Sequence, residues 1–138
     1  MAVDYEMRLK EIIAVVNSHD IERVLSLFAD DFLYEEVVAD STVARNKDEL
    51  RARFQNLFRS FPDLRVELTS YFATGNSLCV EWISSGTHTG DMPGFPATGK
   101  NFSYREVVVI ELTRDKLSRF SLYCDELTFL RQVGLAQN

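Results

Sequence analysis

A glycine- and proline-rich segment, residues 86–100, constrains the fold of this chain more than any other part of the sequence. It holds four of the six glycines and two of the three prolines, and it lies between two runs typical of β-strands. Glycine permits backbone angles that other residues avoid, whereas proline fixes φ and lacks an amide donor. The sequence therefore predicts a sharply shaped loop between two strands. Loops held by a rigid sheet often carry functional groups, so a site is expected near this one.

The spacing of apolar residues predicts helices in the first part of the chain and strands in most of the remainder. Helical spacing predicts a first helix over residues 4–17. A second, short helix is capped by Ser18 or Asp20 and extends to Phe28, and a third runs from Asn46 to Phe61. Asn46 with Glu49 is a variant of the capping box, and Pro62 ends that helix. Strands are expected over residues 32–38, 64–69, 78–88, 102–112 and 117–124, before a closing helix that begins at Asp125.

This order of elements predicts an α+β fold in one domain, residues 1–138. Three helices cannot cover both faces of a meander of long strands. We therefore expect a cone-shaped, curved antiparallel (mixed) β-sheet, with the three N-terminal helices packed on its concave face and an apolar pocket enclosed between them. Arg51, Arg53 and Arg59 are expected on the outer face of the third helix, in contact with solvent.

Charge and composition exclude several classes of partner. The formal charge is −6 with no basic cluster, which argues against nucleic acid and anionic membranes. The N-terminus has no secretory signal, and no apolar run approaches the ~20 residues that span a bilayer, so a cytoplasmic location is expected. Cys79 and Cys124 are expected to be thiols, and the cysteines and histidines show no metal-ligand spacing. With no phosphate-binding or dinucleotide motif either, the sequence predicts no metal and no cofactor.

Asp125 is the first candidate for an acid–base group. It follows Ser121 and Tyr123 at intervals of two, so the three residues share one face of the last strand. If that face lines the pocket, burial would raise the pKa of Asp125 toward the range useful for moving a proton from carbon, with Ser121 and Tyr123 beside the substrate. The alternative is that Asp125 caps the final helix.

Five further residues are candidates for the pocket. His88 shares an apolar strand face with Trp82; it can donate a proton to a substrate carbonyl, or it can fasten the loop by bonding to backbone. Trp82 is expected in the pocket wall or the core. Glu106 shares a face with Tyr104 and is a candidate second carboxylate in the cavity; the alternative is surface pairing with Arg105 or Arg119. Tyr34 and Tyr104 can donate to an oxyanion, or lie at the pocket rim.

Several segments resemble one known family, the SnoaL-like polyketide cyclases of the nuclear-transport-factor-2-like superfamily. The matching segments are Phe61–Leu64, the strand around Trp82, Gly86–Gly90, Pro96–Lys100, Tyr123–Leu127 and Leu130–Leu135. The resemblance extends from about residue 5 to residue 135 in the same element order. It implies that Asp125 is the acid–base group and that two copies associate through the outer faces of their sheets. Ser121 stands where the family often has an aromatic residue, and Glu81 where it often has an arginine.

Two functional hypotheses follow from different classes of protein. In the first, the chain is a cofactor-free lyase or isomerase that acts on a small hydrophobic carbonyl compound, as in the aldol closure of a polyketide. Asp125 is then the base, and His88 or a tyrosine is the donor that stabilises the enolate. In the second, the same cone binds a small apolar ligand, or serves as a dimeric scaffold, without turnover.

Overall fold

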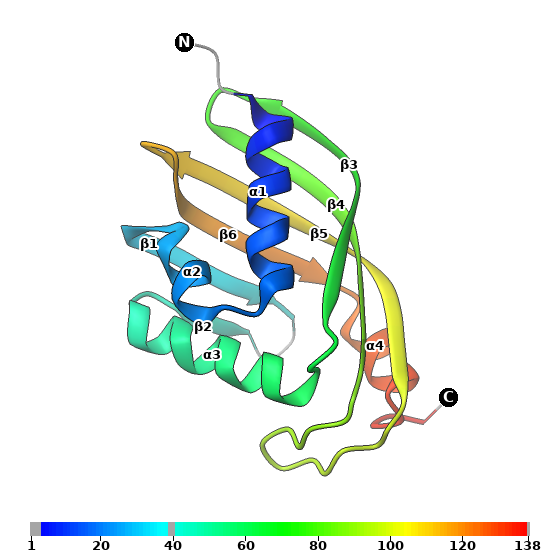
Figure 1. Ribbon diagram of the computed structural model, residues 1–138. Helices are drawn as coiled ribbons and strands as arrows, with labels where there is room; N and C mark the ends of the chain where they lie inside the picture. Colours follow the sequence, from blue (N-terminus) through cyan, green and yellow to red (C-terminus); the bar gives the residue numbers. More distant parts are fainter. Residues whose placement is uncertain (1–3, 39–40, 138) are drawn as a thin grey trace.

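The computed structural model describes residues 4–38 and 41–137 of the chain. The elements follow one another in the expected order (Figure 1). The helices are α1 (Tyr5–Ser18), α2 (Ile21–Ser26), α3 (Lys47–Ser60) and α4 (Glu126–Gln132). The strands are β1 (Phe28–Val37), β2 (Thr42–Ala44), β3 (Arg65–Thr74), β4 (Ser77–Thr87), β5 (Asn101–Thr113) and β6 (Lys116–Cys124).

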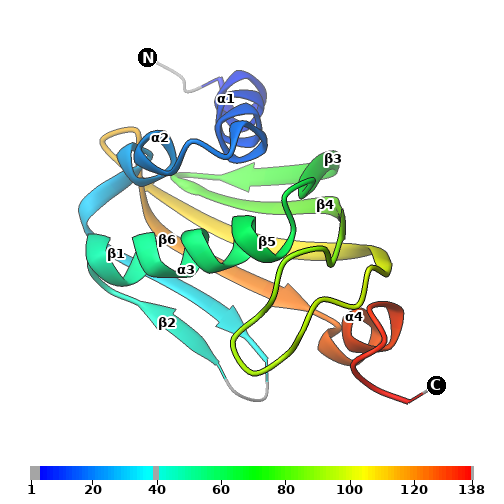
Figure 2. The same ribbon diagram turned by 60° about the horizontal axis from the view of Figure 1, so that its bottom comes forward.

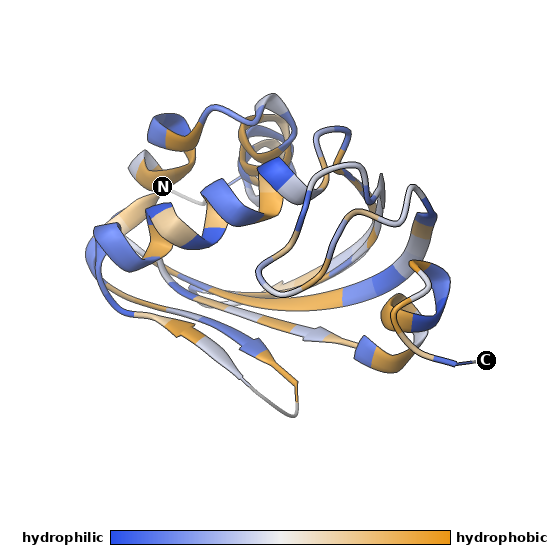
Figure 3. Cartoon of the chain, turned by 90° about the horizontal axis from the view of Figure 1, so that it is seen from below, coloured by the Kyte–Doolittle hydropathy of each residue, from blue (hydrophilic) through white to orange (hydrophobic). Residues whose placement is uncertain are grey.

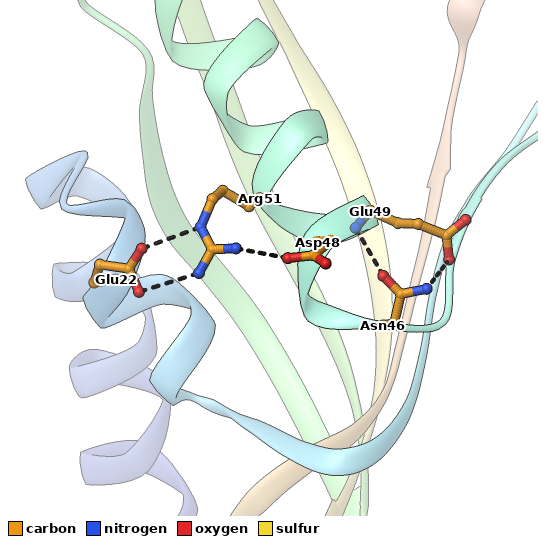
Figure 4. Close-up of polar contacts among 5 residues, drawn as sticks. All are labelled: Glu22, Asn46, Asp48, Glu49 and Arg51. Atoms are coloured by element: carbon orange, nitrogen blue, oxygen red, sulfur yellow. Dashed lines mark hydrogen bonds and ion pairs between the residues drawn. The ribbon is translucent and has the colours of Figure 1, made fainter.

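Side-chain caps fix where the N-terminal helices begin. Asp20 caps α2, and Asn46 caps α3 as predicted. The backbone N–H of Glu49 donates to Asn46 Oδ1 at 2.9 Å, and Asn46 Nδ2 donates to Glu49 Oε1 at 3.0 Å (Figure 4). Arg51 then reaches from α3 to Glu22 on α2, with Nε 3.1 Å from Oε1, so the two helices are joined at their surface (Figure 4).

The six strands form one curved, open sheet in the order β2-β1-β6-β5-β4-β3. All neighbouring pairs are antiparallel except β1 and β6, which are parallel, so the sheet is mixed as expected. The edge strand β2 was not predicted, because three residues are too few to show an alternating pattern. Cys79 and Cys124 are free thiols on opposite faces of the sheet and therefore cannot form a disulfide with each other.

The three N-terminal helices lie on the concave side of the sheet, which confirms the predicted arrangement (Figure 2). A fourth helix, α4, follows β6 at one end of the sheet, where Asp125 was expected to start it. Within the described part of the chain, no helix covers the convex side (Figure 3). The convex side is therefore an uncovered face of sheet.

The loop between β4 and β5 is anchored on the end of α3. The N–H of Gly90 donates to the carbonyl of Ser60 at 3.1 Å. A Cβ atom at Gly90 would lie 1.9 Å from the carbonyl oxygen of Arg59, so only glycine allows this approach. The loop consequently lies between α3 and α4 (Figure 2).

Candidate active site

A cavity of about 320 Å³ lies between the concave face of the sheet, α3, the β4–β5 loop and α4. Its walls are mainly apolar, and Met92 and Pro93 of the loop contribute to them. The predicted apolar pocket is therefore present, and its volume is typical of small-molecule sites.

Strand register brings Glu106 into this cavity. Trp82 on β4, Glu106 on β5 and Cys124 on β6 are direct neighbours across the sheet, and all three line the cavity. Glu106 is only 7% exposed. Trp82 Nε1 donates to its Oε1 at 2.9 Å, and the hydroxyl of Tyr104 donates to its Oε2 at 2.9 Å. The alternative of a surface ion pair for Glu106 is wrong, because both its oxygens are held inside the pocket.

Burial raises the pKa of the Glu106 carboxyl above its usual range, although the hydrogen bonds from Trp82 and Tyr104 favour the charged form. Burial also raises the pKa of the thiol of Cys124, the cross-strand neighbour of Glu106 on β6. Glu106 can therefore exchange a proton with a ligand in the cavity. Cys124 remains a neutral thiol.

A second carboxylate, Glu36 on β1, enters the same cavity as part of an ion pair. Arg53 of α3 donates through Nη2 to Glu36 Oε1 at 2.7 Å and through Nε to Oε2. The hydroxyl of Tyr34 donates to Oε2 at 2.8 Å, and burial raises the pKa of Tyr34 well above its usual value. Burial opposes the charge of Arg53, but Glu36 and Tyr34 together outweigh burial and raise the pKa of that guanidinium. The side chain of Glu36 is thus held inside the cavity by Arg53 and Tyr34.

Glu36 and Arg53 were not predicted as pocket residues, although the strand pattern requires one of Glu35 and Glu36 to point inward and to have a partner. Arg53 was expected on the outer face of α3 and instead points to the sheet, because the buried carboxylate needs a counter-charge. The available signal was the Glu35-Glu36 pair itself. Adjacent strand residues point to opposite faces, so one of the two had to be directed inward.

Of the predicted substrate contacts, Trp82, Tyr34, Tyr104 and Glu106 line the cavity together. Ser121 and Tyr123 do not, and their expected position is wrong. Both lie on the convex face, where the hydroxyl of Ser121 donates to Glu35 Oε2 at 2.7 Å and accepts from Arg119 Nε at 2.9 Å. The other face of β6, with Phe120, Leu122 and Cys124, contributes to the cavity instead.

The expectation that Asp125 faces the cavity is also wrong. Its side chain is exposed and caps α4, with Oδ1 accepting from the Thr128 backbone N–H at 3.1 Å and Oδ2 from the Thr128 hydroxyl at 2.6 Å. These two hydrogen bonds lower the pKa of Asp125, whereas a buried carboxyl would show a raised one. The alternative of an N-cap is therefore confirmed.

His88 lies at the start of the loop and is completely buried. Its Nδ1 accepts from the backbone N–H of Thr98 at 3.3 Å and lies 3.2 Å from the Thr98 hydroxyl. The backbone of His88 also bonds to Gly99 and Lys100, and its ring packs against Phe61. The side chain is outside the set that lines the cavity. These contacts favour the role of fastening the loop.

Solved structures with the same fold are diverse in sequence. A protein from Catenulispora acidiphila with a ketosteroid isomerase-like fold, solved with trimethylamine, is 15% identical over 94% of this chain and 93% of its own, with a TM-score of 0.81. TsrD from Streptomyces laurentii is 19% identical over 98% of this chain and 100% of its own, with a TM-score of 0.80. A phenazine biosynthesis-related protein from Pseudomonas aeruginosa is 22% identical over 100% of this chain and 89% of its own, with a TM-score of 0.77. No curated protein matches the chain.

The fold defined by these strands and helices is the nuclear-transport-factor-2-like fold, shared with the ketosteroid isomerase-like proteins. The sequence profile of the SnoaL-like polyketide cyclases matches residues 6–133. The chain belongs to the SnoaL-like polyketide cyclase family. Within residues 4–38 and 41–137, no helix combines the length and the apolar character needed to cross a membrane.

Proposed function

We propose that the chain is a cofactor-free lyase or isomerase that acts on a small apolar carbonyl compound, and that Glu106 is its acid–base group. The observation that carries this proposal is a carboxyl only 7% exposed, held by two hydrogen bonds inside an apolar cavity. A raised pKa makes the carboxylate of Glu106 a stronger base toward a carbon-bound proton. Glu106 replaces Asp125 in this role, because Asp125 is exposed and occupied at the end of α4.

For a polyketide substrate, as the family name suggests, the proposed reaction is an intramolecular aldol closure. The carboxylate of Glu106 takes a proton from the carbon next to a carbonyl, and the electrons of the C–H bond move to the carbonyl oxygen. The enolate carbon then forms a bond to a second carbonyl of the same molecule, whose oxygen takes the proton back from Glu106. The product is an isomer of the substrate. The apolar walls hold the reacting carbons together, which lowers the entropic part of the barrier.

An assay that needs no knowledge of the natural substrate tests the role of Glu106. The full chain is incubated with 2-tetralone in D₂O, and exchange of the protons next to the carbonyl is followed by NMR. We expect exchange faster than in buffer alone, and a loss of roughly 10²-fold or more in Glu106→Gln, since general bases contribute about 10²–10⁴-fold. Asp125→Asn serves as the matched carboxylate control and keeps the activity.

Two outcomes would contradict the proposal. One is exchange at the same rate in Glu106→Gln as in the wild type, with both proteins folded. The other is no acceleration by the wild type, which would favour a protein of the same fold that binds a ligand without turnover.

A further inference from the structure

Ser84 of β4 has a hydroxyl beside the proposed site that the mechanism does not use. Ser84 follows Trp82 by two residues on the concave face of the same strand, and its direct neighbours across the sheet are Val66 and Tyr104. It is 5% exposed and lines the cavity. Ser84 is therefore two residues further along β4 than Trp82, which pairs with Glu106, and it is closer to the β4–β5 loop.

Three other hydroxyls that line the cavity are already engaged. Tyr34 donates to Glu36, Tyr104 to Glu106, and Ser60 to the carbonyl of Asn56 at 2.7 Å. The hydroxyl of Ser84 forms no hydrogen bond within residues 4–38 and 41–137, yet it is not a buried atom without a partner: those are Arg8 Nε and His88 Nε2. The hydroxyl of Ser84 is therefore accessible from the cavity and can donate a hydrogen bond to a molecule bound there.

The charges in the cavity limit what this ligand can be. Arg53 is the basic residue among the described residues that line the cavity, and both oxygens of Glu36 already bind it. An anionic ligand would therefore meet Glu36 and Glu106 without a free cation to balance it. The occupant that fits is uncharged.

We infer that Ser84 donates a hydrogen bond to an oxygen of the substrate, and that the substrate is an uncharged compound with two separate oxygen functions. One oxygen belongs to the carbonyl next to the carbon that Glu106 deprotonates, and this part of the inference rests on the proposed function. The second oxygen lies toward the loop, at Ser84. Diagonal neighbours on adjacent strands are about 7–8 Å apart, so the two oxygens lie on different parts of the molecule.

Two probes that differ by one hydroxyl test this assignment in the full chain. The affinities of 2-tetralone and 6-hydroxy-2-tetralone are measured by calorimetry and by quenching of Trp82, the single tryptophan of the chain. We expect the wild type to bind the hydroxylated probe about 2- to 10-fold more tightly, the effect of one hydrogen bond. Ser84→Ala should abolish this preference while the affinity for 2-tetralone stays within about 2-fold. Ser85→Ala, on the opposite face of the same strand, should keep it.

The inference is overturned if Ser84→Ala keeps the preference, if the wild type shows none, or if neither probe binds. Thermal unfolding gives an independent readout: Ser84→Ala removes no hydrogen bond within the protein, so its melting temperature should stay close to that of the wild type. Binding does not require turnover. If the wild type shows the binding preference, Ser84→Ala loses it and no proton exchange is seen, only the proposed function is contradicted. If proton exchange depends on Glu106 but the binding preference is absent, only the role of Ser84 is contradicted.

Discussion

At the scale of single residues, the carboxyls of Glu106 and Asp125 show how position decides chemistry. Both lie near the same end of the sheet. Glu106 is enclosed by apolar walls, and burial raises its pKa. Asp125 is exposed, and its hydrogen bonds with Thr128 lower its pKa. Of these two carboxyls, Glu106 is the one that lines the cavity and has a raised pKa.

The indole of Trp82 is expected to position Glu106 and to tune its pKa. Its N–H favours the charged carboxylate, so Trp82→Phe should raise the pKa of Glu106 further. The acid limb of the exchange-rate profile against pH should then move to higher pH. Leu57→Ala, which alters the same cavity from α3 without removing a donor to Glu106, is the control. An unmoved acid limb in Trp82→Phe would disprove this role.

The same carboxyl predicts how stability depends on pH. Because the pKa of Glu106 is raised in the folded chain, the folded state keeps its proton at pH values where the unfolded chain, with a pKa of about 4.3, has lost it. Stability relative to Glu106→Gln should therefore fall as pH rises from about 4.3 through the folded pKa. Urea unfolding of both proteins from pH 4 to 7 measures this difference. A difference that grows with pH would contradict the assigned shift.

At the scale of elements, the Glu36–Arg53 pair connects β1 to α3 across the cavity. The side chains are 13% and 30% exposed, respectively. Arg53→Met removes the counter-charge and leaves Glu36 buried without it, which should lower the free energy of unfolding by about 2–4 kcal/mol, since Arg53 is only partly buried. Glu36→Leu combined with Arg53→Met should recover most of this loss. Urea unfolding at pH 7 tests both; equal stabilities of the single and double variants would show that the pair is not coupled.

Sequence patterns predicted the helices, the long strands and the shaped loop, because each has a local physical signal such as a cap, an alternation or a glycine. They did not predict which face of β6 looks inward. Ser121 and Leu122 are both compatible with burial, and the side is decided by where the helices pack and by the irregular β5–β6 register near Glu111 and Leu112. Asp125 and Ser121 were misplaced for this reason. Glu106 was identified by the cost of an inward carboxylate in a strand.

At the scale of the whole molecule, the convex face of the sheet is not covered by any helix of the described residues (Figure 3). Val107 and Val109 of β5 are half-buried there, and Phe72 of β3 is 70% exposed. The family resemblance predicts association of two copies through this face. Its exposed apolar side chains lie among charged ones such as Glu81 and Arg105, a mixture that a protein interface can accommodate.

We expect the protein to be a homodimer of 15.8 kDa subunits in solution. Val109→Lys places a charge in the middle of the convex face and should yield monomers, as measured by light scattering after size exclusion. Phe95→Lys, an exposed apolar position in the β4–β5 loop, should leave the dimer intact. A monomeric wild type, or a dimeric Val109→Lys with native circular dichroism, would show that this face does not mediate association.

The parallel pairing of β1 with β6 has a consequence for biosynthesis. Glu36 and Leu122 are partners in that pairing, although 86 residues separate them along the chain. While the ribosome is still making β3, β4 and β5, β1 can pair only with the short β2, and one edge of it stays open to other nascent chains. Contacts of such long range also slow folding. The cavity that holds Glu106 can therefore form only after β6, Lys116–Cys124, has left the ribosomal exit tunnel, and a chain that ends before β6 would lack it.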